Sequence, residues 1–286
     1  MTRASNLLRK IRGNKMVLIS SVILAVTFFC GAFAGFLAPY SPYDQALENK
    51  LKPPFFTDQK GRAHVLGTDQ LGRDVLSRVF YGIRVSLLIG IMAVAISAVF
   101  GVILGLIAGY YGGLLDDVIM RIADVQLSIP LILLAISVII VLGSSIQVLI
   151  VVIGLTQWIS YARMVRGQAL SLREKDFVTS AYAVGASDLR VLTRYILPNT
   201  LSSVTVLVTL NMATVIVLEA GLSFLGLGIQ PPEPSLGTML SESTSYLSSA
   251  WWLSTFPGLT IMVIILAINL FGDGLRDVLD PRLENY

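Results

Sequence analysis

Residues 176–199 read DFVTSAYAVGASDLRVLTRYILPN and lie between two long apolar segments of the chain. Apolar residues at helical spacing predict a short first helix whose apolar stripe is formed by Phe177, Ala181 and Val184. Gly185 follows directly, and glycine is the usual residue where a helix ends in a left-handed turn. The stretch therefore predicts an amphipathic helix that stops at a glycine turn.

A second helix is predicted after that turn. Ser187 is a typical N-cap residue, and Asp188 places a carboxylate at the positive end of the helix. Its apolar stripe consists of Leu189, Leu192 and Ile196. Pro198 lacks a backbone N–H, so this helix is predicted to end near Leu197. Two alternatives stay open here: the two helices lie flat on a membrane surface, or they insert into a groove on a partner protein.

The whole chain has the composition of a protein that crosses a membrane several times. Of its 286 residues, 55% are hydrophobic and 14% are charged, whereas soluble domains carry about 25% charged residues. Backbone polar groups in lipid need partners within the chain, so spans of this kind must be helices. We predict an all-α polytopic fold with six transmembrane helices at about 16–39, 84–110, 118–142, 147–165, 200–220 and 256–273.

Basic residues predict the orientation of these spans, because cytoplasmic loops are enriched in Lys and Arg. Loop 161–199 is rich in Arg, loop 221–255 has no Lys or Arg, and the N-terminal tail has basic but no acidic residues. Loop 40–83 is long and of mixed charge, which weakens its contribution. We predict that both termini and loop 161–199 are cytoplasmic and that the other two loops lie outside.

This orientation divides the chain into parts. The first apolar segment is longer than the apolar core of a signal peptide, so we predict an uncleaved span. The predicted parts are a tail at 1–15, the first span at 16–39, an outer loop at 40–83, a core domain at 84–273 that contains the inner loop 161–199 and the outer loop 221–255, and a tail at 274–286.

Small and aromatic residues indicate how the spans pack and where they end. Gly101, Gly105 and Gly109 occupy every fourth position of the second span, a spacing that lets helices approach closely. Trp251 and Trp252 precede the sixth span, and tryptophan favours the membrane interface. We therefore predict close helix packing at the glycines and an interfacial position for the tryptophans.

Ionisable residues are rare within the spans. Asp117, Arg121 and Asp124 are spaced to share one helix face, which predicts a local ion pair near the inner surface. Glu219 lies at the outer end of the fifth span, where two roles stay open, lining of a substrate path and an interfacial or packing role. The single His64 and single Cys30 predict no metal site. Because carboxylates near the midplane are missing, an ion-coupled secondary carrier is only a remote alternative.

Part of the opening stretch resembles the inner-loop motif of ABC importer membrane subunits. The residues that match are Ser180-Ala181, Gly185 and Ile196-Leu197-Pro198-Asn199. In that family a Glu-Ala-Ala triplet precedes the glycine, whereas Thr179-Ser180-Ala181 stands here. The acidic residue is absent, so the resemblance does not carry over any ion pair that it makes to the ATPase in relatives.

Three further segments are similar to the dipeptide, oligopeptide and nickel subgroup of that family. They are His64–Arg78, Leu222–Gly228 with Pro231-Pro232, and Gly272–Asp277 with Leu279-Asp280-Pro281. The resemblance thus extends over nearly the whole chain and implies a type I ABC importer permease architecture. It also implies import of di- or oligopeptides, with nickel or another metal chelate as the alternative, across a bacterial or archaeal cytoplasmic membrane.

The resemblance further implies the partners of the chain. They are a second homologous permease subunit, usually a different chain, two cytoplasmic ATPase subunits, an extracytoplasmic substrate-binding protein and membrane lipid, and no nucleic acid is expected. The residues expected to couple to the ATPase are Asp176, Thr179, Ser180, Ala181, Gly185, Ala186, Ser187, Asp188, Leu197 and Pro198. A phosphate-binding G-x-x-x-x-G-K-[ST] motif is missing from the sequence, so we expect no catalytic residue and no cofactor in this chain, with ATP and Mg bound by the partners.

Overall fold

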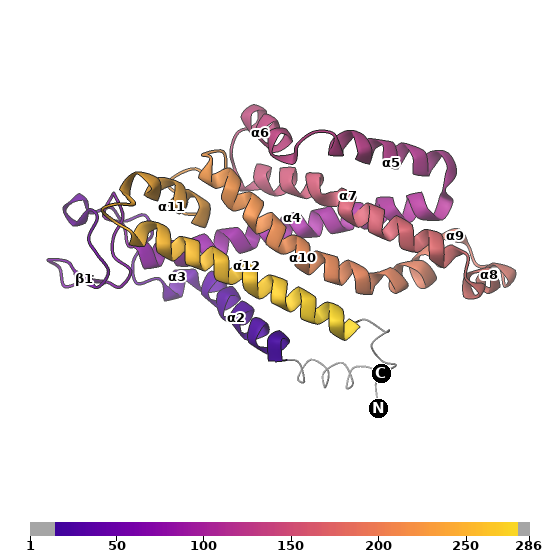
Figure 1. Ribbon diagram of the computed structural model, residues 1–286, viewed down its shortest axis with the longest axis horizontal. Helices are drawn as coiled ribbons and strands as arrows, with labels where there is room; N and C mark the ends of the chain where they lie inside the picture. Colours follow the sequence, from indigo (N-terminus) through magenta and orange to yellow (C-terminus); the bar gives the residue numbers. More distant parts are fainter. Residues whose placement is uncertain (1–14, 280–286) are drawn as a thin grey trace.

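Long helices lie side by side in the computed structural model, which describes residues 15–279 (Figure 1). Its helices are α2 (Lys15–Ala32), α3 (Ala34–Leu37), α4 (Val75–Tyr111), α5 (Gly113–Leu127), α6 (Leu131–Leu142), α7 (Ile146–Arg173), α8 (Asp176–Ala183), α9 (Asp188–Val191), α10 (Leu197–Phe224), α11 (Leu236–Ser243) and α12 (Trp252–Leu279). The predicted tails at 1–15 and 274–286 lie largely outside the described residues.

The described residues contain five helices that are long and apolar enough to cross a membrane, or six if one bent pair counts as a span. Much of their apolar surface is exposed; on α2, for example, Val22, Val26 and Phe28 are each more than half exposed. In water such a surface would be costly, whereas lipid is its natural environment. The predicted all-α membrane fold is therefore confirmed.

Helices α4 and α7 form the central pair of the fold, and the predicted glycine stripe lies between them. A Cβ atom at Gly101 would lie 2.4 Å from the carbonyl oxygen of Trp158. At Gly105 and Gly109 it would lie 2.6 Å from the carbonyl oxygens of Ala162 and Arg166, respectively. Only glycine permits this approach of two backbones, so the prediction of close packing is confirmed.

The predicted span 118–142 is not a single straight helix. Helices α5 and α6 meet at an angle of 87°. Pro130 directly precedes α6, and a proline inside a continuous helix would remove a backbone hydrogen bond and clash with the preceding turn. The apolar composition of residues 118–142 is continuous across this break and therefore does not reveal it. In Figure 1, α5 runs beside α7, and α6 lies next to the start of α7.

The ion pairs of α5 also differ from the prediction. The turn at Gly112 folds α5 back beside α7, so its acidic residues meet arginines of that helix. The Asp124 carboxylate accepts from the Arg163 guanidinium at 2.6 Å, and Asp116 accepts from Arg166 at 2.6 Å. Within residues 15–279, Arg121 forms no ion pair, so the predicted local pair is wrong.

Helix α4 begins at Val75, within the region predicted as the outer loop 40–83. The Asp74 carboxylate caps it by accepting the backbone N–H of Ser77 at 2.8 Å, and it also contacts His64 Nδ1 at 2.9 Å. With 37 residues, α4 is about 56 Å long at 1.5 Å per residue. It is therefore longer than the roughly 30 Å hydrocarbon core of a bilayer.

The helix predicted to end near Leu197 instead continues without a break into α10. A π-helical turn, η2 (Leu192–Ile196), joins α9 to α10, and the backbone N–H of Leu197 donates to the carbonyl of Leu192. In an α-helix the proline ring clashes with the carbonyl group four residues before it. The wider π-helical turn before Pro198 relieves this clash. Residues 188–224 thus form one continuous helical segment.

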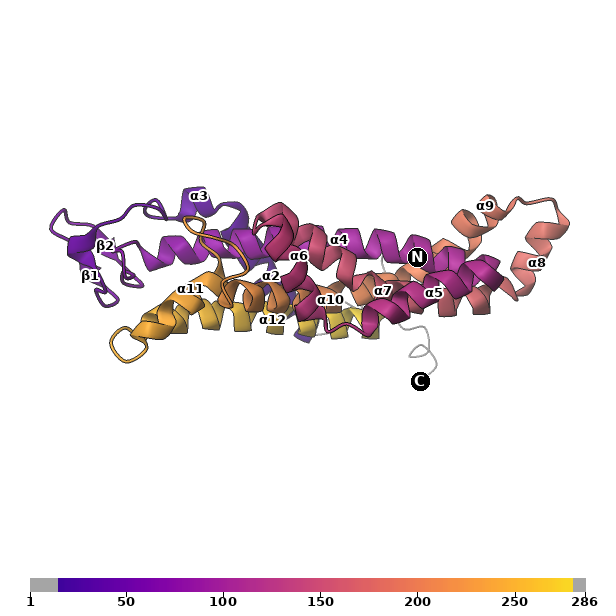
Figure 2. The ribbon, with the colours of Figure 1, turned by 90° about the horizontal axis from the view of Figure 1, so that it is seen from above.

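A lobe built from the two predicted outer loops lies at the opposite end of the molecule from α8 and α9 (Figure 2), and we call it the outer lobe after that prediction. It contains α11 and the short elements η1 (Leu47–Asn49), β1 (Phe56–Thr57), β2 (Ala63–His64) and η3 (Thr244–Tyr246). Strands β1 and β2 pair antiparallel. Trp252 is only 5% exposed, and its indole N–H donates to the carbonyl of Thr68. Trp252 is therefore buried within the chain and fixes α12 to this lobe, and its predicted interfacial position stays a prediction.

Candidate functional site

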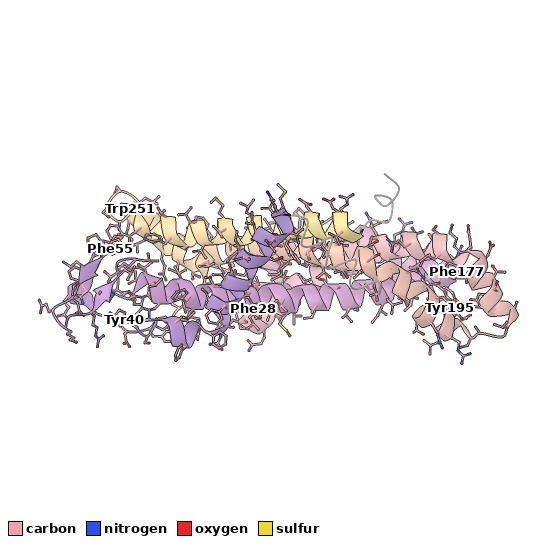
Figure 3. All side chains as sticks on the ribbon, turned by 90° about the horizontal axis from the view of Figure 1, so that it is seen from below. Phe28, Tyr40, Phe55, Phe177, Tyr195 and Trp251 are labelled. Carbon is pink, nitrogen blue, oxygen red and sulfur yellow. The ribbon has the colours of Figure 1, made fainter. Side chains whose placement is uncertain are left out.

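Helices α8 and α9, with the turn between them, form one end of the molecule. Figure 3 shows Phe177 and Tyr195 at this end, far from Tyr40, Phe55 and Trp251 at the other. Because α8 follows α7 after two residues and α9 continues into α10, both helices are attached directly to long helices of the bundle. Movement of α8 and α9 would therefore reach the long helices through short connections.

The turn between α8 and α9 has the predicted left-handed glycine. Gly185 has φ +80°, and its backbone N–H donates to the carbonyl of Tyr182 at 2.9 Å. The N–H of Ala186 donates to the carbonyl of Ala181 at 3.0 Å. These two bonds form a Schellman motif, which ends the helix and satisfies its last carbonyls. The predicted glycine turn is confirmed.

The buried face of α8 differs from the predicted stripe. Val178 is 0% exposed and Ala181 is 4% exposed, and both pack into the cluster that also holds Val191 and Ile196. Phe177 and Val184, by contrast, are 41% and 84% exposed. Of the predicted stripe, Ala181 therefore packs into the bundle, whereas Phe177 and Val184 face away from it.

An exposed apolar surface remains on the outside of the two helices. It consists of Phe177, Val184 and Leu189, and we call it the end surface. Val184 is 84% exposed in the turn after α8, and Leu189 is 70% exposed near the start of α9. The Phe177 ring stacks on that of Tyr195 at a centroid distance of 6.5 Å, which orients its apolar edge.

The structure brings together most of the residues expected to couple to an ATPase. Ala181 is buried, Ala186 and Leu197 are half-buried, and the exposed members are Asp176, Thr179, Ser180, Gly185, Ser187, Asp188 and Pro198. Thr179, which replaces the acid of the family motif, is exposed on α8. Ser187 occupies the N-cap position of α9, but its side chain forms no capping hydrogen bond.

Asp188 has a role that the sequence did not reveal. Its carboxylate accepts a hydrogen bond from the Tyr110 hydroxyl at 2.8 Å and one from the Tyr182 hydroxyl at 3.2 Å. The two hydroxyls also contact each other. Because Tyr110 lies in the last turn of α4, this cluster connects α4, α8 and α9. We call it the tyrosine–aspartate contact.

The pKa of the Tyr182 hydroxyl lies above its ordinary value. Partial burial raises the pKa of Tyr182, and the Asp188 carboxylate raises it further through its charge and hydrogen bond. At neutral pH the hydroxyl therefore remains protonated. Arg173, near the end of α7, donates to the carbonyls of Gly109 and Tyr110, both at 3.3 Å, so a second contact joins this end of α4 to its surroundings.

Glu219 lies in the interior of the described chain and is 0% exposed. Its carboxylate accepts hydrogen bonds from Ser86 Oγ at 2.9 Å and Ser223 Oγ at 2.8 Å. It therefore links α10 to α4 through a buried polar contact. This environment supports the packing role among the two that the sequence left open.

The outer lobe is held by a compact ion-pair network. The Asp69 carboxylate accepts from Arg73 Nε at 2.6 Å and from Arg78 at 2.5 Å. Glu242 on α11 accepts from the same two arginines at 3.0 and 2.9 Å, and from Gln70 at 2.8 Å. Burial acts to raise the pKa of Glu242, but Arg78, Gln70 and Arg73 together outweigh it and lower the pKa.

These acidic and basic groups neutralise one another. Among the described residues 15–279, no three His, Cys, Asp or Glu side chains are grouped so that they could hold a metal ion. The motif His64–Arg78, which the sequence associated with a subgroup of transporters, therefore contributes the loop that fixes the start of α4.

A bundle of apolar helices with paired short helices at one end is the architecture of a transporter membrane subunit. The chain belongs to the family described as the binding-protein-dependent transport system inner membrane component, whose profile matches residues 101–285. Residues 2–54 match the N-terminal transmembrane domain of oligopeptide transport permease C. The chain is thus a multi-pass inner-membrane protein of bacteria, and its family implies a binding protein and an ATPase as partners.

Several curated proteins are similar over almost the whole chain. The di/tripeptide transport system permease protein DppC of Pseudomonas aeruginosa is 41% identical, with 95% of this chain and 90% of that protein covered. DppC of Haemophilus influenzae, a dipeptide permease, is 42% identical, with 95% and 92% covered. GsiD of Escherichia coli, a glutathione transport permease, is 42% identical, with 96% and 89% covered.

Solved structures of two transporters share the fold. The MetNI methionine ABC transporter, in an inward-facing conformation, has a chain that matches with a TM-score of 0.56 at 19% identity, covering 70% of this chain and 96% of that one. An amino acid ABC transporter with histidines matches with a TM-score of 0.54 at 12% identity, covering 70% and 93%. The predicted ABC importer permease architecture is thereby confirmed.

Proposed function

We propose that this chain is the membrane-spanning subunit of an ATP-driven, binding-protein-dependent importer of short peptides. The observation that carries the proposal is the combination of full-length similarity to peptide permeases with the end surface on α8 and α9. Relatives at 41% and 42% identity are named for di- and tripeptides, dipeptides and glutathione. Glutathione is itself a tripeptide, so the named cargoes share one chemical class.

The end surface is the site at which the ATPase would dock. Phe177, Val184 and Leu189 present exposed apolar side chains at the tip of the bundle. A pair of short helices with an exposed apolar face suits insertion into a groove on a partner. With Thr179 in place of the family's acid, docking relies on apolar contact and shape rather than on a charge at that position.

The proposal also includes the orientation and the partners. The end surface and both termini face the cytoplasm, because the loop and the N-terminal tail carry the excess of basic residues. A Cβ at Gly274 near the end of α12 would lie 2.1 Å from the side chain of Val17 on α2, so these two ends lie together. A second homologous permease completes the path, and two ATPase subunits bind the ATP and Mg that this chain does not bind.

Uptake by the purified complex tests this proposal. The complex with its ATPase and partner permease is reconstituted in liposomes with ATP inside and the binding protein outside, and radiolabelled dialanine is the probe. We expect uptake that requires both ATP and the binding protein. Uptake of a nickel–histidine chelate but not of dialanine would refute the peptide assignment, and uptake by this chain alone under a proton gradient would refute ATP coupling.

A further inference from the structure

The tyrosine–aspartate contact is the structural feature from which a further role follows. The Tyr110 side chain is 8% exposed and lies in the last turn of α4, whereas Asp188 is the first residue of α9. Both tyrosine hydroxyls donate to the same carboxylate oxygen, Oδ1. Hydrogen bonds to a charged acceptor are stronger than those between neutral groups. The two short helices are thus joined to α4, to which neither is connected along the chain.

Helix α4 continues from this contact to the outer lobe. Its Gly101, Gly105 and Gly109 lie against the backbone of α7, so these two helices cannot slide without a clash. At its outer end Ser86 donates to Glu219, and Arg78 pairs with Glu242 of α11. A single stiff element therefore connects the short helices at one end with the outer lobe at the other.

The covalent connections of the end surface do not follow this route. Helix α8 follows α7, and α9 continues through η2 into α10. Motion of the end surface would reach α7 and α10 through the chain itself. Its direct delivery to the last turn of α4 depends on noncovalent contacts. They are the apolar cluster that holds Leu106 and Tyr110 together with Val178, Ala181 and Val191, and the hydrogen bonds of the tyrosine–aspartate contact.

We propose that Tyr110, Tyr182 and Asp188 are positioning residues that transmit the motion of α8 and α9 to α4, and so couple ATP hydrolysis to movement of α4 and of the outer lobe attached to it. This inference rests on the proposed function. None of the three residues needs to touch the substrate or the nucleotide. Their loss would leave the ATPase docked and active but would waste a larger share of its cycles.

The test compares variants of the whole reconstituted complex. Tyr110→Phe/Tyr182→Phe removes both hydroxyls but keeps both rings, and Asp188→Asn keeps an acceptor oxygen. Tyr111→Phe is the matched control, because Tyr111 is the neighbour of Tyr110 and its hydroxyl forms no hydrogen bond within residues 15–279. Dialanine uptake and ATP hydrolysis are measured together, with the amount of co-purified ATPase recorded for each variant.

We expect uptake per ATP to fall at least about fivefold in the double variant, the scale of one of the two hydrogen bonds that are removed, with unchanged co-purified ATPase. Asp188→Asn, which keeps an acceptor oxygen but loses the charge, should lie between the wild type and the double variant, and Tyr111→Phe should keep the wild-type ratio. A wild-type ratio in the double variant would overturn the proposal, as would an equal loss in Tyr111→Phe. If the double variant does not assemble, Tyr182→Phe alone carries the test, because its side chain is 43% exposed.

A failure of the proposed function gives a different result. If the wild-type complex takes up no dialanine, the peptide importer assignment fails before any variant is compared. If the wild type takes up dialanine and the double variant matches its uptake per ATP, only the tyrosine–aspartate coupling fails.

Discussion

Substitution of Gly105 by alanine probes the packing that makes α4 and α7 one unit. In an ordinary helix this change is stabilising by about 1 kcal/mol, because alanine has the higher helix propensity. Here the added Cβ would lie 2.6 Å from the carbonyl oxygen of Ala162 and 3.0 Å from its Cα. Both atoms belong to the backbone of α7, so no side-chain rotation relieves the contact.

The magnitude follows from the cost of overpacking. Forcing an extra carbon into a tight interior costs about 1–3 kcal/mol, and this cost exceeds the gain in helix propensity of about 1 kcal/mol over most of its range. We therefore expect Gly105→Ala to lower the stability of the chain in detergent, with a net loss of up to about 2 kcal/mol from these two terms.

Gly167→Ala provides the control for this experiment. Gly167 lies within α7, and a Cβ there would meet nothing within 4 Å. The same chemical change should therefore be neutral or stabilising. Thermal unfolding of both variants in the same detergent, followed by gel filtration after heating, measures the difference. Equal stability of Gly105→Ala and Gly167→Ala would refute the close packing of α4 against α7.

Three further predictions concern the outer lobe and the glycine turn. Arg78→Ala should destabilise the fold by about 3 kcal/mol, because Asp69 loses one of its two buried partners, as thermal unfolding would show. Because the pKa of Glu242 is lowered in the folded chain, its carboxylate stabilises the fold at pH values above its ordinary pKa of 4.5, and this stabilisation is lost as the pH falls through the lower folded pKa. Glu242→Gln should remove this part of the acid sensitivity, as unfolding curves at several pH values would show. An unchanged pH dependence in this variant would contradict the prediction. Gly185→Trp places a large side chain at φ +80° and should abolish ATP-coupled uptake while the chain still inserts, and normal transport would contradict a rigid turn.

The features best predicted from sequence were those set by backbone geometry or by bulk hydropathy. The left-handed turn at Gly185 and the glycine stripe on α4 both follow from the absence of a Cβ atom. The apolar segments were found because a span needs about 20 apolar residues. In each case one physical requirement dictates the residue type, whatever the neighbouring helices do.

The effect of a proline on helix continuity is harder to predict from sequence, because it depends on the local helix type. Pro130 stands at the break between α5 and α6, inside a segment that was predicted to be one span. Pro198 was expected to end a helix, yet a π-helical turn before it keeps residues 188–224 continuous. A proline in the sequence specifies a missing N–H, and the tertiary packing decides how the backbone accommodates it.

Contacts between segments that are distant in the chain could not be predicted from the sequence. Asp188 was predicted as a charge at a helix start, and its bonds to Tyr110 and Tyr182 depend on the position of α4. The same holds for Trp252, which donates to a carbonyl of the outer lobe. Residue type fixes which bonds a side chain can form, whereas the fold selects its partner.

The most direct measurement for the central claim is cross-linking from the end surface. With Cys30→Ser as the background, a photoreactive label is attached to Val184→Cys, whose native side chain is 84% exposed at the tip of α8 and α9. Phe55→Cys, 80% exposed in the outer lobe, is the matched control. We predict that the Val184 position cross-links to the ATPase and the Phe55 position does not. A cross-link to the ATPase from Phe55, or none from Val184, would contradict docking of the ATPase at the end surface.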